Sequence, residues 1–101
     1  MNLVYHSTRN SEETATASEA ILKGLTSDGG LFVPDSIPKL NVSLEDLTQM
    51  SYQEIAYAVM KEFLTDFTEE ELRNCIEKAY DSKFDDEAIA PLVKVEDTYY
   101  L

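Results

Sequence analysis

A pair of helix-forming segments in the second half of the chain constrains the fold more than any other feature of the sequence. In the first segment, apolar residues recur at the three-and-four spacing that lines one face of a helix. They are Tyr52, Ile55, Ala56, Val59, Met60, Phe63 and Leu64. This spacing predicts a helix from about Ser51 to Leu64. Ser51 is placed to be its N-cap, and Glu54 is placed to complete a capping box.

The second segment repeats this pattern after only Thr65 to Phe67. Thr68 and Glu71 form another capping-box pair, and the acids after Thr68 suit the positive end of the helix dipole. Its apolar stripe consists of Leu72, Cys75, Ile76, Ala79 and Tyr80. Because the connection is so short, we expect the two helices to pack as an antiparallel pair. The residues expected in their core are Ile55, Val59, Phe63, Leu72, Ile76 and Ala79.

The rest of the chain favours shorter elements. Weaker helix starts are found at Thr16 with Glu19 and at Ser43 with Asp46. Short apolar runs predict strands at Leu3 to Tyr5 and at Leu31 to Val33, and β-prone residues predict a hairpin from Leu92 to Leu101. The expected fold class is therefore α+β, with a layer of about four short helices, a short sheet and a terminal β-hairpin.

Composition limits the classes of protein to which the chain can belong. A length of 101 residues with 44% hydrophobic content suits a single domain around one core. A formal charge of -12 opposes phosphate backbones and anionic lipids, so neither nucleic acid nor a membrane is an expected partner. Cys75 is the single cysteine, which excludes an internal disulfide. No signal peptide or membrane-spanning run is recognisable, and the predicted location is the cytoplasm.

No residue pattern predicts a catalytic centre, a cofactor-binding site or a metal site. The lysines do not stand beside a Gly/Ser-rich loop that could cradle a phosphate. His6 and Ser7 would point to opposite faces of a strand, which argues against a hydrolase triad. Asp28-Gly29-Gly30 lacks the alternating oxygen ligands of a calcium loop. Cys75 lies in an apolar stripe, so we expect it to be buried rather than reactive.

Four phrases nevertheless resemble, in their order and spacing, the amino-terminal domain of threonine synthases. They are Tyr5-His6-Ser7-Thr8-Arg9, Glu19-Ala20-Ile21-Leu22-Lys23-Gly24-Leu25, Asp28-Gly29-Gly30-Leu31-Phe32-Val33-Pro34 and Ala79-Tyr80. Gly24 suits the left-handed position that ends a helix, with Leu25 folding back over the apolar face of that helix. Gly29 and Gly30 permit a tight turn into the following strand. Asn10 departs from the glycine that is usual in the family, but Asn tolerates a positive φ.

The resemblance implies that the whole protein is a pyridoxal-phosphate enzyme of threonine biosynthesis. Such an enzyme is a carbon–oxygen lyase that converts O-phosphohomoserine and water to threonine and phosphate, with the cofactor as electron sink. The resemblance also implies that residues 1–101 form only the amino-terminal domain. The cofactor lysine and the catalytic domains would follow Leu101 in the same chain. The isolated chain is then expected to bind no pyridoxal phosphate and to be inactive.

Within the matching phrases, Ser7, Thr8 and Arg9 are candidates for shaping the substrate entrance, because in the family they lie near the domain junction. The planar guanidinium of Arg9 would suit a phosphate-bearing substrate. Pairing of Arg9 with a local carboxylate is the structural alternative. A free-standing acidic helical interaction module is the alternative for the whole chain, and its surface anchors would be Tyr57, Phe67, Tyr99 or Tyr100.

Overall fold

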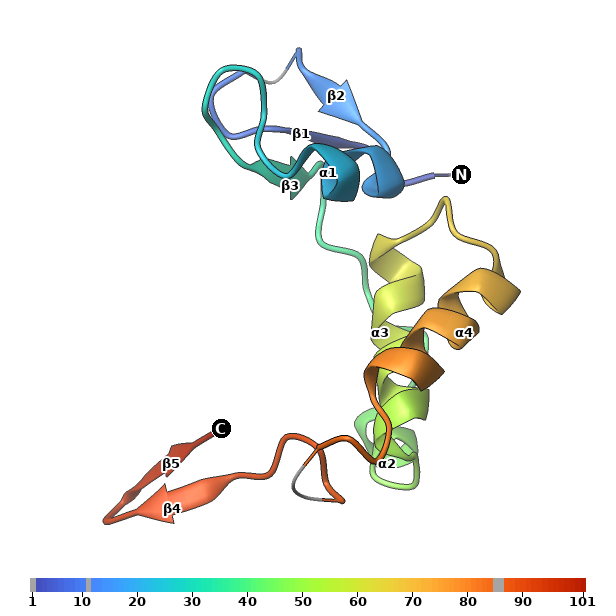
Figure 1. Ribbon diagram of the computed structural model, residues 1–101, viewed down its shortest axis with the longest axis vertical. Coiled ribbons are helices and arrows are strands. Elements are labelled where there is room, and N and C mark those ends of the chain that lie inside the picture. The colour runs from blue at the N-terminus through green and yellow to red at the C-terminus, as the bar shows by residue number, and fades with distance from the viewer. Residues whose placement is uncertain (1, 11, 85–86) are drawn as a thin grey trace.

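The computed structural model describes residues 2–10, 12–84 and 87–101. In chain order the elements are β1 (Tyr5–Ser7), β2 (Thr14–Ala15), α1 (Ala17–Lys23), β3 (Phe32–Pro34), α2 (Leu44–Leu47), α3 (Tyr52–Phe63), α4 (Glu69–Ala79), β4 (Val93–Val95) and β5 (Thr98–Tyr100). Figure 1 shows a small sheet with α1 at one end, helices α2 to α4 beside it, and the β4–β5 hairpin extended away from both. The α+β class and the terminal hairpin are confirmed. No helix in the described ranges is long and apolar enough to cross a membrane.

The first sheet has the order β2-β1-β3, and both of its pairings are antiparallel. Its strands begin later than predicted, since β1 covers Tyr5–Ser7 and β3 covers Phe32–Pro34. Leu3 lies outside the ladder, and its N–H donates to Thr65 Oγ1 at 2.8 Å. The short strand β2 was not predicted because its two residues show no apolar alternation.

The helix starts agree with the sequence. Thr16 and Thr68 form complete capping boxes with Glu19 and Glu71, and Ser43 caps α2. At α3 only half of the predicted box forms, because Ser51 Oγ accepts from the N–H of Glu54 at 3.2 Å without a reciprocal bond. The side chain of Glu54 instead lines the groove between α3 and α4, together with Tyr57 and Arg73.

Helices α3 and α4 pack side by side, as the short connection between them predicts (Figure 1). Ala58 of α3 and Leu72 and Ile76 of α4 are buried. The guanidinium of Arg73 lies 4.0 Å from the centre of the Tyr57 ring, and Arg73 Nε donates to Glu69 Oε1 at 2.9 Å. A short apolar seam and a cation–π contact therefore hold the pair together.

Part of the predicted core is wrong. Leu72 and Ile76 are buried, and Ile55, Val59 and Phe63 are half-buried, but Ala79 and Cys75 are exposed. Within the described chain α4 packs mainly against α3, so only one residue per turn faces its partner. Leu25 is also 61% exposed and does not cover α1 as expected. It forms an isolated β-bridge with Leu31 instead.

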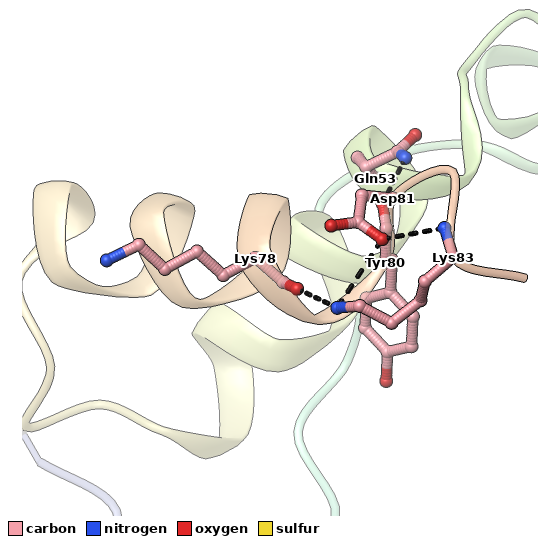
Figure 2. Close-up of polar contacts among 5 residues, drawn as sticks. All are labelled: Gln53, Lys78, Tyr80, Asp81 and Lys83. Carbon is pink, nitrogen blue, oxygen red and sulfur yellow. Dashed lines mark hydrogen bonds and ion pairs between the residues drawn. The ribbon is translucent and has the colours of Figure 1, made fainter.

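The carboxyl end of α4 is tied to the beginning of α3 (Figure 2). Gln53 Nε2 donates to the carbonyl of Tyr80 at 2.5 Å. The ammonium of Lys83 donates to the carbonyl of Lys78, and its backbone N–H donates to Asp81 Oδ1 at 2.9 Å. The bonds from Gln53 and from the Lys83 ammonium satisfy two carbonyls at the end of α4 that have no partner within the helix.

Polar contacts join the first sheet and α1 to the helical pair. Tyr5 Oη donates to the carbonyl of Phe63 at 2.6 Å, and burial, with Asp66 nearby, raises the pKa of this phenol. The carboxylate of Asp66 accepts from the backbone N–H of Ser18 at 3.1 Å and from its hydroxyl. Desolvation raises the pKa of Asp66, but these hydrogen bonds outweigh it and the net pKa is lowered. The joint between these parts therefore depends on directional hydrogen bonds and not on apolar contacts alone.

Candidate functional site

The phrases Ser7-Thr8-Arg9 and Asp28-Gly29-Gly30, far apart in sequence, meet at the end of β1. Asp28 Oδ1 accepts from Ser7 Oγ at 2.8 Å, from Thr26 Oγ1 at 2.5 Å and from the N–H of Gly30 at 3.2 Å. Ser7 is 2% exposed, and its Oγ also accepts from the N–H of Arg9 at 3.1 Å. A buried network of hydroxyls thus locks the turn after β1 to the loop before β3.

The network also determines the charge of its carboxylate. Hydrogen bonds from Thr26, and next from Ser7, hold the pKa of Asp28 below its usual value despite some desolvation. Asp28 is therefore ionised at neutral pH and acts only as an acceptor. Because the proton of Ser7 is committed to this carboxylate, the hydroxyl has a structural role.

Thr8 and Arg9 lie at the surface side of the same site. Thr8 makes two hydrogen bonds to Leu31: its N–H donates to the carbonyl at 2.9 Å, and its Oγ1 accepts from the N–H at 3.1 Å. Arg9 is exposed, and its Nη1 donates to the backbone carbonyl of Asp28 at 3.2 Å. The expected alternative of a carboxylate partner for Arg9 is not met among the described residues. The guanidinium is therefore oriented without being neutralised by an ion pair there.

The glycines of this site have separate reasons to be glycine. Gly29 has a φ of +81°, and a Cβ there would lie 3.3 Å from Arg9 Nη1. Gly30 needs no positive φ, but a Cβ there would lie 2.6 Å from Ser7 Oγ and 2.9 Å from Thr8 Oγ1. Close approach to the hydroxyl network, rather than a turn conformation, excludes a side chain at Gly30.

The arrangement does not form a hydrolase or a metal centre. Ser7 is buried, while His6 Nδ1 lies 2.7 Å from Asp35 Oδ1 and takes no part in the Ser7 network. Within the described ranges, no three His, Cys, Asp or Glu side chains gather as a metal site.

Sequence reasoning did not identify Thr26 or the pair formed by Glu13 and Ser27. Thr26 accepts from the N–H of Gly30 at 2.7 Å, and Glu13 Oε2 accepts from the N–H of Ser27 at 2.9 Å. The available signal was a Thr-Ser-Asp run directly before two glycines, which is typical of side chains that bond to a local backbone. Nothing in that run indicated that its partner would be Ser7.

Comparison with known proteins identifies the family. The model of the threonine synthase N terminus matches residues 4–80. The chain belongs to the threonine synthase family. It is 41% identical to the threonine synthase of Eremothecium gossypii over 99 residues, which is 93% of this chain and 19% of that protein.

Solved threonine synthases have the same fold in this region. The crystal structure of the yeast threonine synthase matches with a TM-score of 0.78 and 36% identity, covering 89% of this chain and 18% of that one. A pyridoxal-phosphate-bound threonine synthase from Brucella melitensis matches with a TM-score of 0.75 and 31% identity over 91% of this chain and 20% of that one. The chain thus spans about a fifth of the length of these relatives and corresponds to their amino-terminal part. Family membership replaces the alternative of an unrelated interaction module.

The Gly-Gly turn of this threonine synthase domain does not fit the phosphate of pyridoxal phosphate. The lysines of the domain are all exposed, and two of them lie against aromatic rings: Lys61 over Tyr57 and Lys94 over Tyr99. The N–H groups of the Gly-Gly turn are already used, since Gly29 donates to the carbonyl of Thr26 and Gly30 to side-chain oxygens. The turn therefore offers no cup of free amides to a phosphate.

Proposed function

We propose that this chain is the amino-terminal domain of a longer cytoplasmic threonine synthase, and that its partner is the catalytic part of the same polypeptide. The whole enzyme converts O-phosphohomoserine and water to threonine and phosphate, as a carbon–oxygen lyase. The observation that carries the proposal is the match of residues 4–80 to the threonine synthase N terminus, together with the likeness to the yeast structure.

In this proposal the domain supplies structure rather than chemistry. Pyridoxal phosphate, held by the catalytic part, supplies the electron sink for the reaction. The exposed lysines and the occupied amides of the Gly-Gly turn support the expectation that the isolated chain holds no cofactor. Its charge of -12 also opposes binding of a phosphorylated substrate at most of its surface.

Arg9 is the candidate exception on that acidic surface. The bond from its Nη1 to the carbonyl of Asp28 orients the guanidinium, which lies beside the position that a Cβ of residue 29 would occupy. Ser7 and Thr8 support this position of the guanidinium, because they bond to Asp28 and Leu31 in the adjoining loop. We therefore assign Ser7 and Thr8 to positioning, and Arg9 to attracting the substrate phosphate at the entrance.

Assays on two polypeptides test the proposed function. The full-length gene product, supplied with pyridoxal phosphate and O-phosphohomoserine, should release phosphate and retain a cofactor absorption band after dialysis. The 101-residue chain should do neither. A full-length protein without threonine-forming activity would overturn the proposed function. A stable cofactor band in the isolated chain would overturn the expectation that the chain alone holds no pyridoxal phosphate.

The role of Arg9 requires its own comparison. In the full-length enzyme, Arg9→Ala should raise the KM for O-phosphohomoserine about 10-fold with little change in kcat or in the unfolding midpoint. Lys39→Ala, which removes another exposed positive charge, is the matched control. Equal kinetic effects of the two substitutions would mean that Arg9 contributes only to the overall charge and has no specific role toward the substrate phosphate.

A further inference from the structure

The β4–β5 hairpin is not covered by the domain that carries it. Every residue of both strands is exposed, and each strand makes its main contacts with the other. Figure 1 shows the hairpin extending away from the first sheet and from the helical pair. An isolated two-stranded hairpin is only marginally stable in water. Its persistence as an ordered element requires a further partner.

The register of the hairpin gives its faces different character. Val93 pairs with Tyr100 and Val95 pairs with Thr98, so these side chains share one face. On that face Val93 and Val95 are each 53% exposed and Tyr100 is 55% exposed. The other face carries the Lys94–Tyr99 pair, in which the ammonium lies 5.7 Å from the ring centre. Both faces are exposed, and Tyr99 is 61% exposed, but only the face of Val93, Val95 and Tyr100 lacks a charged side chain.

The position of the hairpin in the chain indicates what covers it. The match to the threonine synthase N terminus ends at residue 80, whereas similarity to the Eremothecium gossypii protein covers 93% of the chain. The hairpin at 93–100 thus lies past the last residue that matches the model of the threonine synthase N terminus. About four-fifths of each relative lies outside the matched part.

We propose that the hairpin is the docking surface for the domain that follows in the full-length threonine synthase. The apolar face formed by Val93, Val95 and Tyr100 packs against that domain, and a free edge of the hairpin pairs with one of its strands. This inference rests on the proposed function in one respect: it takes the polypeptide to be longer than these 101 residues. A covalently tethered partner is present at an effective concentration of order millimolar. A second copy would have to approach against a net charge of -12 on each chain.

Hydrogen exchange of the wild-type proteins is the first test. We expect the backbone amides of β4 and β5 to exchange about 100-fold more slowly in the full-length protein than in the 101-residue chain. Amides buried between α3 and α4 serve as an internal reference in both proteins. Equal exchange in the two polypeptides would overturn the proposal. Protection that grows with the concentration of the 101-residue chain would assign the face to a second copy.

A pair of variants then tests which face is covered. Val93→Thr with Val95→Thr keeps β-branched residues but removes apolar surface, and it should lower hairpin protection about 10-fold in the full-length protein. Lys94→Thr, on the opposite face, should leave protection unchanged. Neither variant should alter the 101-residue chain. Equal effects of both variants would contradict the assigned face.

Activity measured on the same wild-type preparation separates the two proposals. An active full-length enzyme with an unprotected hairpin removes only this inference. A protected hairpin in a protein without threonine synthase activity removes only the proposed function.

Discussion

Replacing Gly30 by alanine should disrupt the network that joins the two matching phrases. The added Cβ would lie 2.6 Å from Ser7 Oγ, 2.9 Å from Thr8 Oγ1 and 3.0 Å from Thr26 Oγ1. Because Ser7 and Thr26 are buried, these hydroxyls have little room to move away. Overpacking costs about 2 kcal/mol, and loss of one hydrogen bond adds about 1 kcal/mol. We therefore expect Gly30→Ala to lower the free energy of unfolding by about 3 kcal/mol.

Gly24→Ala is the matched control for this substitution. Gly24 lies in a γ-turn with φ +74° and ψ −68° but has nothing within 4 Å of its added Cβ, so its replacement should cost only the backbone strain of about 2 kcal/mol. Urea unfolding followed by circular dichroism measures both variants. For an m-value of about 2 kcal/mol/M, the midpoint should fall by about 1.5 M for Gly30→Ala and about 1 M for Gly24→Ala.

A double-mutant cycle identifies the cause of the loss at Gly30. Ser7→Ala removes the nearest atom, so Gly30→Ala should cost at least about 1 kcal/mol less in that background than in the wild type. The reasoning is refuted if the two substitutions add independently, or if Gly30→Ala costs no more than Gly24→Ala.

Three further outcomes follow from the same geometry. Asp66→Asn weakens the joint to Ser18, and it should lower the free energy of unfolding by about 1–2 kcal/mol in a urea titration. The lowered pKa values of Asp28, Asp66 and Glu71 mean that each carboxylate stabilises the fold above its unfolded pKa. The urea midpoint should therefore be level from about pH 7 to pH 5 and fall below about pH 4. Glu96 has a positive φ of 56° in the hairpin turn, and Glu96→Gly relieves this strain, which should stabilise the hairpin by about 1 kcal/mol. Hydrogen exchange in β4 and β5 should therefore slow about fivefold.

Local signals predicted the helices well because their causes lie within a few residues of one another. Ser51, Thr68 and Thr16 cap as expected, since a hydroxyl and the N–H three residues later form a self-contained unit. The hairpin was predictable for the same reason, because β-prone residues flank a short polar turn.

Burial was harder to predict, because it depends on what packs against an element. The apolar stripe of α4 includes Cys75 and Ala79, but α3 covers only the line through Leu72 and Ile76. Periodicity shows which face of a helix is apolar and does not show how wide its neighbour is. The same reason explains why Leu25 is exposed despite its place after a helix-ending glycine.

The candidate site was predictable in its local phrases but not in the long-range contact between them. The resemblance singled out Ser7, Thr8 and Arg9, and separately the Asp28-Gly29-Gly30 turn. Their meeting depends on the pairing of β1 with β3, which brings Ser7 opposite Phe32. Long-range pairing of this kind leaves no trace in either phrase alone.

The joint between the sheet and the helices bears on how the sequence can change over evolution. Two of its bonds use the backbone N–H of Leu3 and the backbone carbonyl of Phe63, with side chains supplied by Thr65 and Tyr5. A main-chain group persists through most substitutions, so position 3 can drift among all residues except proline, which lacks the N–H. For these two bonds, selection therefore acts on only one partner, the side chain. The contact can persist in a lineage while half of its apparent participants are replaced.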